Sequence, residues 1–93
     1  MTMASARHIL VATEDACNKL KAEIKSGKTD FAAAAKKHSS CPSGKSGGEL
    51  GSFGPGQMVP EFDTVVFNAE VGKVHGPVKT QFGYHLLEVT SRG

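Results

Sequence analysis

The chain has 93 residues and a mass of 9.8 kDa, which leaves room for one domain because domains usually take roughly 100–200 residues. The hydrophobic share is 39% with no tryptophan, so aliphatic side chains and five phenylalanines must supply the core. Charged residues are 22% of the chain and the net charge is +2, which excludes a disordered composition and gives no argument for nucleic acid as a partner.

The chain begins with a segment that predicts a strand and then a helix. Arg7–Ala12 is mostly apolar and contains β-branched residues, which is typical of a short strand, and residues 1–6 before it are expected to form a flexible N-terminus. Thr13 is a candidate helix cap, and Gly27 suits the end of that helix. The apolar positions of the helix recur on one face: Cys17, Leu20 and Ile24.

A second helix and a long loop follow. Thr29 and Asp30 are cap residues for a helix that runs through Phe31 and four alanines and ends among cations, which the helix dipole favours there. Residues 39–48 are dominated by Gly, Pro and Ser, so we expect a loop without regular structure.

The second half of the chain predicts three strands and one helix. Glu49–Phe53 can form a short strand, and an apolar stripe behind Pro60 fits a third helix. A short strand is expected within residues 71–80, and Tyr84–Thr90 alternates as a strand does. The resulting order, β-α-α-β-α-β-β, indicates an α+β fold in which helices cover a sheet of four short strands.

The same residues exclude several classes of site. No apolar run approaches the ~20 residues of a membrane span, and no signal-peptide region follows Met1, so we expect a cytoplasmic protein with no membrane partner. The cysteines and histidines show no metal-ligand spacing, and no cofactor is expected. A G-x-S-x-G motif is absent, although Cys41 with a distant histidine leaves a thiol nucleophile conceivable.

Two histidines attract attention because of where they lie. His8 and His85 each precede an apolar run, in the first and the last expected strand. If these two strands pair, both imidazoles can lie on one face of the sheet, close to hydrogen-bond reach. The alternative is that each is a partly buried structural histidine satisfied by backbone or hydroxyl groups.

Three segments resemble the parvulin family of peptidyl-prolyl cis/trans isomerases: HIL at 8–10, SSCPSGKSGGELGSFGPGQMVPEF at 39–62 and GPVKTQFGYHLLEV at 76–89. They follow the family order over nearly the whole chain and are most similar to the small, single-domain prokaryotic type. The resemblance implies a four-stranded antiparallel sheet flanked by three or more helices, with residues 7–93 forming one isomerase domain.

The resemblance also implies a set of site residues. The catalytic positions are His8, Cys41 and His85. The substrate-binding positions are Leu50, Gln57, Met58, Phe62 and Phe82. Leu50, Met58 and Phe62 are expected to form the proline pocket, although ordinary core packing is the alternative for them. Phe82 stands where many members have a small polar residue, so we expect it to extend the apolar wall, and Gln57 is expected at the rim.

The resemblance implies an isomerase that assists folding by rotating X–Pro bonds of peptides and unfolded proteins, without a covalent step and as a monomer. The alternative is a proline-peptide binding or chaperone-like module with little catalysis. Members that act on phosphorylated Ser/Thr–Pro bonds carry a basic cluster after the first strand, whereas here Glu14 and Asp15 follow it. Two acids repel phosphate, so we expect activity that does not depend on phosphorylation.

Overall fold

A computed structural model of the protein describes residues 3–58 and 60–92. Four strands and three α-helices follow one another there in the expected order. The elements are β1 (Ala4–Val11), α1 (Glu14–Ser26), α2 (Phe31–His38), β2 (Glu49–Phe53), α3 (Pro60–Val66), β3 (Val74–Thr80) and β4 (Gly83–Arg92). The strands form one antiparallel sheet in the order β2-β1-β4-β3. The predicted fold class is therefore confirmed.

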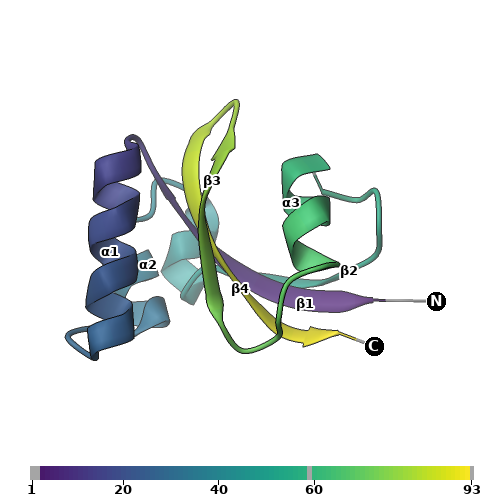
Figure 1. Ribbon diagram of the computed structural model, residues 1–93, viewed down its shortest axis with the longest axis horizontal. Coiled ribbons are helices and arrows are strands. Elements are labelled where there is room, and N and C mark those ends of the chain that lie inside the picture. The colour runs from purple at the N-terminus through teal and green to yellow at the C-terminus, as the bar shows by residue number, and fades with distance from the viewer. Residues whose placement is uncertain (1–2, 59, 93) are drawn as a thin grey trace.

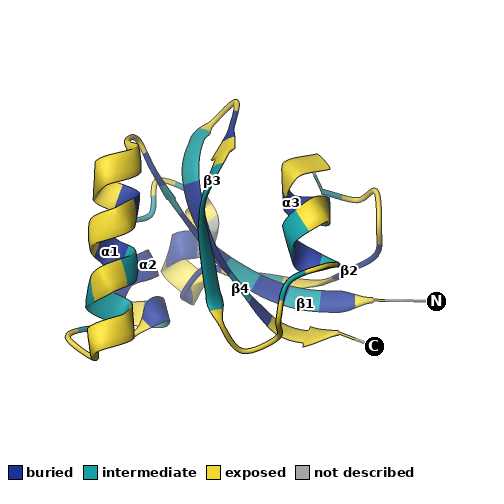
Figure 2. Ribbon diagram, in the orientation of Figure 1, coloured by how far each residue is buried: buried dark blue, intermediate teal, exposed yellow. Residues whose placement is uncertain are grey.

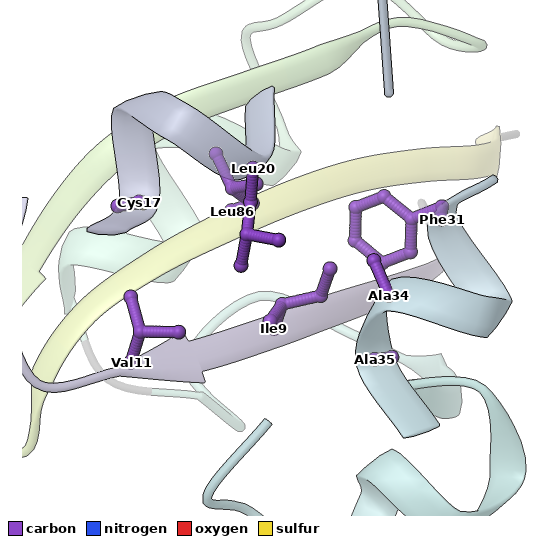
Figure 3. Close-up of a cluster of buried hydrophobic side chains, with 8 residues drawn as sticks. All are labelled: Ile9, Val11, Cys17, Leu20, Phe31, Ala34, Ala35 and Leu86. Carbon is purple, nitrogen blue, oxygen red and sulfur yellow. The ribbon is translucent and has the colours of Figure 1, made fainter. Parts of the chain in front are cut away.

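The sheet separates two apolar clusters, because α1 and α2 lie on one side of it and α3 on the other (Figure 1). On the first side, Ile9 and Val11 of β1 and Leu86 of β4 meet the inner faces of both helices (Figure 3). On the second side, alternate residues of the same strands, including Ala6 and Val89, pack with Val66 of α3. Because successive side chains of a strand point to opposite faces, the same two strands supply residues to both apolar clusters.

The predicted caps are present at both helices of the first layer. Thr13 Oγ1 accepts the Ala16 amide proton at 3.2 Å, and Asp30 Oδ1 accepts that of Ala33 at 2.7 Å. Gly27 ends α1 with φ of +84°, the left-handed conformation that glycine adopts most readily. The outer faces of α1 and α2 are exposed and their inner faces buried (Figure 2).

The N-terminal boundary differs from the expected one. The prediction began the first strand at Arg7 and made residues 1–6 a flexible segment, yet β1 begins at Ala4. Ala4 and Ala6 are buried and pair with both β2 and β4, so residues 4–6 belong to the sheet. Their short apolar side chains gave no periodic signal, and the part of this prediction that concerns residues 1–2 lies outside the described residues.

The loop at residues 39–48 is more regular than expected. Pro42–Ser46 forms one turn of 3₁₀ helix, with hydrogen bonds from the Gly44 amide to Cys41 O at 2.9 Å and from the Gly47 amide to Gly44 O at 3.0 Å. Glycine and proline therefore mark a tight helical turn here. No helix within residues 3–58 and 60–92 has the length and apolarity to cross a membrane.

Candidate active site

An apolar cavity of about 380 Å³ lies on the α3 side of the sheet. It brings together residues from both central strands, β2, α3 and three loops. The lining residues are His8, Leu10, Ser40, Cys41, Pro42, Leu50, Met58, Phe62, Phe82 and His85. Seven of the eight predicted site residues are among them, and Gln57 is not.

The two histidines meet at the buried end of this cavity. In the β1–β4 register His8 lies opposite Leu87 and Leu10 opposite His85, so the histidines are diagonal neighbours on one face. Their Nδ1 atoms are 3.2 Å apart and their rings are nearly parallel, with centroids 5.4 Å apart. The predicted pairing of the two imidazoles on one face is confirmed, and His8 lies in the middle of β1.

Burial keeps this pair uncharged at neutral pH. His8 and His85 are 4% and 3% exposed, and loss of hydration disfavours the charged imidazolium. Burial, with a smaller contribution from His85, lowers the pKa of His8 to about 4, and burial also lowers the pKa of His85. Two neutral rings can share the short contact because one Nδ1 donates and the other accepts.

Thr80 fixes the outer nitrogen of His85. Its Oγ1 lies 2.7 Å from Nε2 of His85 and accepts the Phe82 amide proton at 3.2 Å. The Thr80 hydroxyl proton is then free to be donated to Nε2, so we assign His85 the tautomer whose Nδ1 donates to His8. The sequence prediction missed Thr80; its signal was the tight β3–β4 turn, which places Thr80 opposite Gly83 and near His85.

Phe62 connects the histidines to the pocket wall. Its ring, buried on α3, meets His85 edge to face at 4.6 Å and His8 at 5.5 Å. Leu50 and Met58 are half-buried; they line the cavity and also pack against the apolar cluster beneath α3. Pocket lining and core packing were alternatives for these residues, and Leu50 and Met58 do both.

Cys41 enters the cavity from the end of the α2 segment. The hydroxyl oxygen of Ser39 accepts the Leu10 amide proton at 3.1 Å and the Cys41 amide proton at 3.3 Å, which holds the segment against β1. The Ser40 amide donates to Leu10 O at 2.8 Å. Leu10, Ser40 and Pro42 were not predicted as lining, and their signal was adjacency to His8 and Cys41.

Gln57 and Phe82 lie in contrasting places. The Gln57 side chain turns back, and its Oε1 accepts the Gly54 amide proton at 2.6 Å, so it closes its own turn and does not line the cavity. Phe82 lines the mouth while 64% exposed, which leaves its ring open to a ligand. No cluster of three metal-ligating side chains occurs in the part of the chain that is described.

A four-stranded antiparallel sheet with helices on both faces, and two neutral histidines beneath an apolar pocket, define a parvulin-like isomerase domain. The model of one family, described as the rotamase or PPIC-type PPIase domain, matches residues 5–91. The chain belongs to this family of peptidyl-prolyl isomerase domains.

Curated relatives include longer proteins. Foldase protein PrsA 4 of Bacillus cereus is 46% identical over 86 residues, which are 91% of this chain and 30% of the relative. Chaperone SurA of Albidiferax ferrireducens is 37% identical, over 99% of this chain and 22% of the relative. The chain thus spans about a third or less of the length of these relatives.

Solved structures of similar proteins have the same fold. PrsA of Bacillus anthracis, a peptidylprolyl isomerase by its description, gives a TM-score of 0.94 at 33% identity, covering 99% of this chain and 42% of that chain. NmPin, the parvulin of Nitrosopumilus maritimus, gives a TM-score of 0.87 at 34% identity and covers 98% of both chains.

The expected cytoplasmic location is wrong. The relatives include PrsA and SurA, and a similar structure, at a TM-score of 0.90 and 36% identity, comes from work on PEB4 and the periplasmic protein Cj1289, two SurA-like chaperones of Campylobacter jejuni. These relatives point outside the cytoplasm. The expectation failed because it rested on the lack of an apolar leader, which is no evidence in a chain spanning so little of its relatives.

Proposed function

We propose that this domain catalyses cis/trans isomerisation of the peptide bond before proline in peptides and unfolded proteins, and thereby assists their folding. The observation that carries the proposal is the apolar cavity with the uncharged pair His8 and His85 at its buried end. The names of the relatives, foldase and chaperone, support unfolded proteins as substrates.

The physical task is to lower a rotational barrier. Amide resonance sets a barrier of roughly 18–20 kcal/mol, and rotation breaks no covalent bond. A catalyst has to bind the twisted amide more tightly than either planar form. The twisted amide has lost conjugation and is less dipolar, so an apolar pocket favours it relative to water.

The pocket residues suit this task without nucleophilic chemistry. Leu50, Met58 and Phe62 grip the proline ring, so the carbonyl side of the bond rotates. The neutral pair His8 and His85 shapes the end of the pocket, and a charge there would cost free energy of desolvation. Cys41 acts as a small apolar wall, since isomerisation needs no covalent intermediate.

The preferred substrates have apolar residues before proline, and phosphorylation is not required. β1 ends at Val11 and α1 begins at Glu14, so no basic loop lies between them. Glu14 and Asp15 are the first two residues of α1, directly after the end of β1. Their charges repel phosphate, while the exposed Phe82 ring favours an apolar neighbour of proline.

The domain acts as a monomer.

The second candidate is a chaperone-like module that binds proline peptides with little catalysis, because the same apolar pocket serves binding and the SurA relative is named a chaperone. Exchange spectroscopy by NMR on a peptide with an apolar residue before proline separates the two. We expect catalytic amounts of protein to produce cis–trans exchange cross-peaks. Peptide binding without faster exchange would favour the chaperone-like module.

A further inference from the structure

Two pocket residues, Met58 and Phe62, come from two different segments of the chain, so the width of the pocket depends on how these segments are held relative to each other. Met58 follows the turn at residues 54–57, whereas Phe62 lies on α3. Two hydrogen bonds between Gln57 and Gly54 close the turn on itself: the Gln57 amide donates to Gly54 O at 3.3 Å, and Gln57 Oε1 accepts the Gly54 amide proton. These contacts fix the shape of the turn but not its place relative to the helix.

Asp63, the residue after Phe62, makes the connection between the two segments. Its Oδ2 accepts the Gly56 amide proton at 2.6 Å, across seven residues of the chain. Gly56 has φ of +85°, a left-handed conformation that other residues adopt at a cost. A carboxylate acceptor makes a backbone hydrogen bond shorter and stronger than a neutral acceptor does.

We propose that Asp63 is a positioning residue of the isomerase site, which sets the distance between the Met58 and Phe62 walls by holding the turn to α3. The inference rests on the proposed function. The other carboxylate oxygen, Oδ1, is buried and has no hydrogen-bond partner among the described residues. A buried oxygen without a hydrogen-bond partner costs free energy. The Asp63 side chain as a whole therefore stabilises the fold less than it would with both oxygens satisfied.

The expected defect is in binding. Met58 and Phe62 contact the proline ring in the planar and the twisted forms alike, so loosening this wall weakens both equally. For Asp63→Ala we expect the peptide dissociation constant to rise about tenfold, as loss of a charge-assisted hydrogen bond allows. The exchange rate of the bound peptide changes less than about threefold.

Two variants separate position from stability. Asp63→Asn keeps an oxygen that accepts the Gly56 amide proton, so we expect its dissociation constant within about twofold of the wild type. Asp30→Ala is the matched control, because Asp30 also accepts a backbone amide proton at 2.7 Å but caps α2 on the opposite face of the sheet. It should lower the melting temperature and leave peptide binding unchanged.

The test is an NMR titration that follows the peptide and the Gly56 amide together. The Gly56 resonance should lose its hydrogen-bonded, downfield position in Asp63→Ala and keep it in Asp63→Asn. If Asp63→Ala does not fold, Asp63→Asn alone decides, since binding and the Gly56 resonance must be retained or lost together. If the wild type catalyses exchange and Asp63→Ala binds the peptide as tightly as the wild type does, this inference alone is wrong. If the wild type does not catalyse exchange, the proposed function is wrong and this inference falls with it.

Discussion

At neutral pH, His8 and His85 face each other without charge, because burial lowers the pKa of both rings and holds that of His8 at about 4. In the unfolded chain a histidine titrates near 6.5. Between these values the unfolded state binds a proton that the folded state does not, so the free energy of unfolding falls as the pH falls from about 6.5 to 4. Below about 4 this contribution levels off.

For His8 the difference corresponds to roughly 3 kcal/mol, a large share of the stability of a small domain. Urea denaturation at a series of pH values measures it. We expect the slope below pH 6.5 to shrink in His8→Gln and to persist in His38→Gln, where the exposed residue lies on the last turn of α2. An unchanged slope in His8→Gln would contradict the assignment of this proton uptake.

We predict that the pocket walls matter more to isomerase activity than the Cys41 thiol does. We expect Phe62→Ala and Met58→Ala to lower kcat/KM roughly tenfold or more, about 1.4 kcal/mol, because the planar and the twisted peptide are both bound less tightly. Cys41→Ser should cost less than about threefold, because no bond to sulfur forms. A protease-coupled proline-peptide assay gives the ranking.

The matched control for the wall is Phe67→Ala, since Phe67 packs against Phe53 at 6.1 Å and does not line the cavity. It removes a ring of the same size just beyond α3. A larger activity loss in Cys41→Ser than in the wall variants would reverse the ranking, and an equal loss in Phe67→Ala would trace the effect to stability.

Most of the cavity could be predicted because the family motifs mark it in the sequence. Thr80 could not, since its role depends on a hydroxyl reaching a ring five residues away across a turn. Gln57 was placed at the rim by adjacency to Met58, but its amide is taken up by the Gly54 backbone. A motif gives the position of a side chain along the chain, and competing backbone groups decide where it points.

At the scale of elements, one glycine allows β1 to lie beside the start of β2. A Cβ at Gly48 would stand 2.3 Å from His8 O, and the residue has φ of +87°. Gly51 has a similar φ of +75° but open space around the Cβ position. Gly48→Ala should therefore displace the His8 backbone as well as strain the turn.

We expect Gly51→Ala to cost about 1–2 kcal/mol of stability from its left-handed conformation alone, with activity retained. Gly48→Ala should cost more and should also remove most of the activity, because His8 moves. Chemical denaturation together with the exchange assay tests both variants. Equal effects at the two glycines would mean that the contact with His8 is unimportant.

Helices and central strands were predictable from local signals. The caps Thr13 and Asp30 and the terminal Gly27 act through hydrogen bonds within one or two turns, so the sequence contains their cause. The start of β1 was not predictable, since Ala4 and Ala6 become strand residues only through β2 and β4. Pairing partners far along the chain decide such boundaries.

At the scale of the whole molecule, the proposed substrate preference depends on the short connection between β1 and α1 and on the two acids that follow it. We expect peptides with an apolar residue before proline to turn over several-fold faster than matched phosphoserine–proline peptides. The comparison is made at low and high salt, because screening should reduce the difference if charge causes it. Faster turnover of the phosphopeptide would contradict the proposed preference.

The position of the two chain ends has a mechanical consequence. Ala4 and Arg92 are partners in the β1–β4 register, so the start of β1 and the end of β4 lie side by side at one end of the two central strands (Figure 1). A tension applied through these ends would load the hydrogen bonds between β1 and β4 one after another, as a zipper opens, instead of all at once in shear. Opening would begin at the Ala4–Arg92 pair and reach the pair of His8 and Leu87 only after several hydrogen bonds had broken, so the pocket lies away from the point where force first acts.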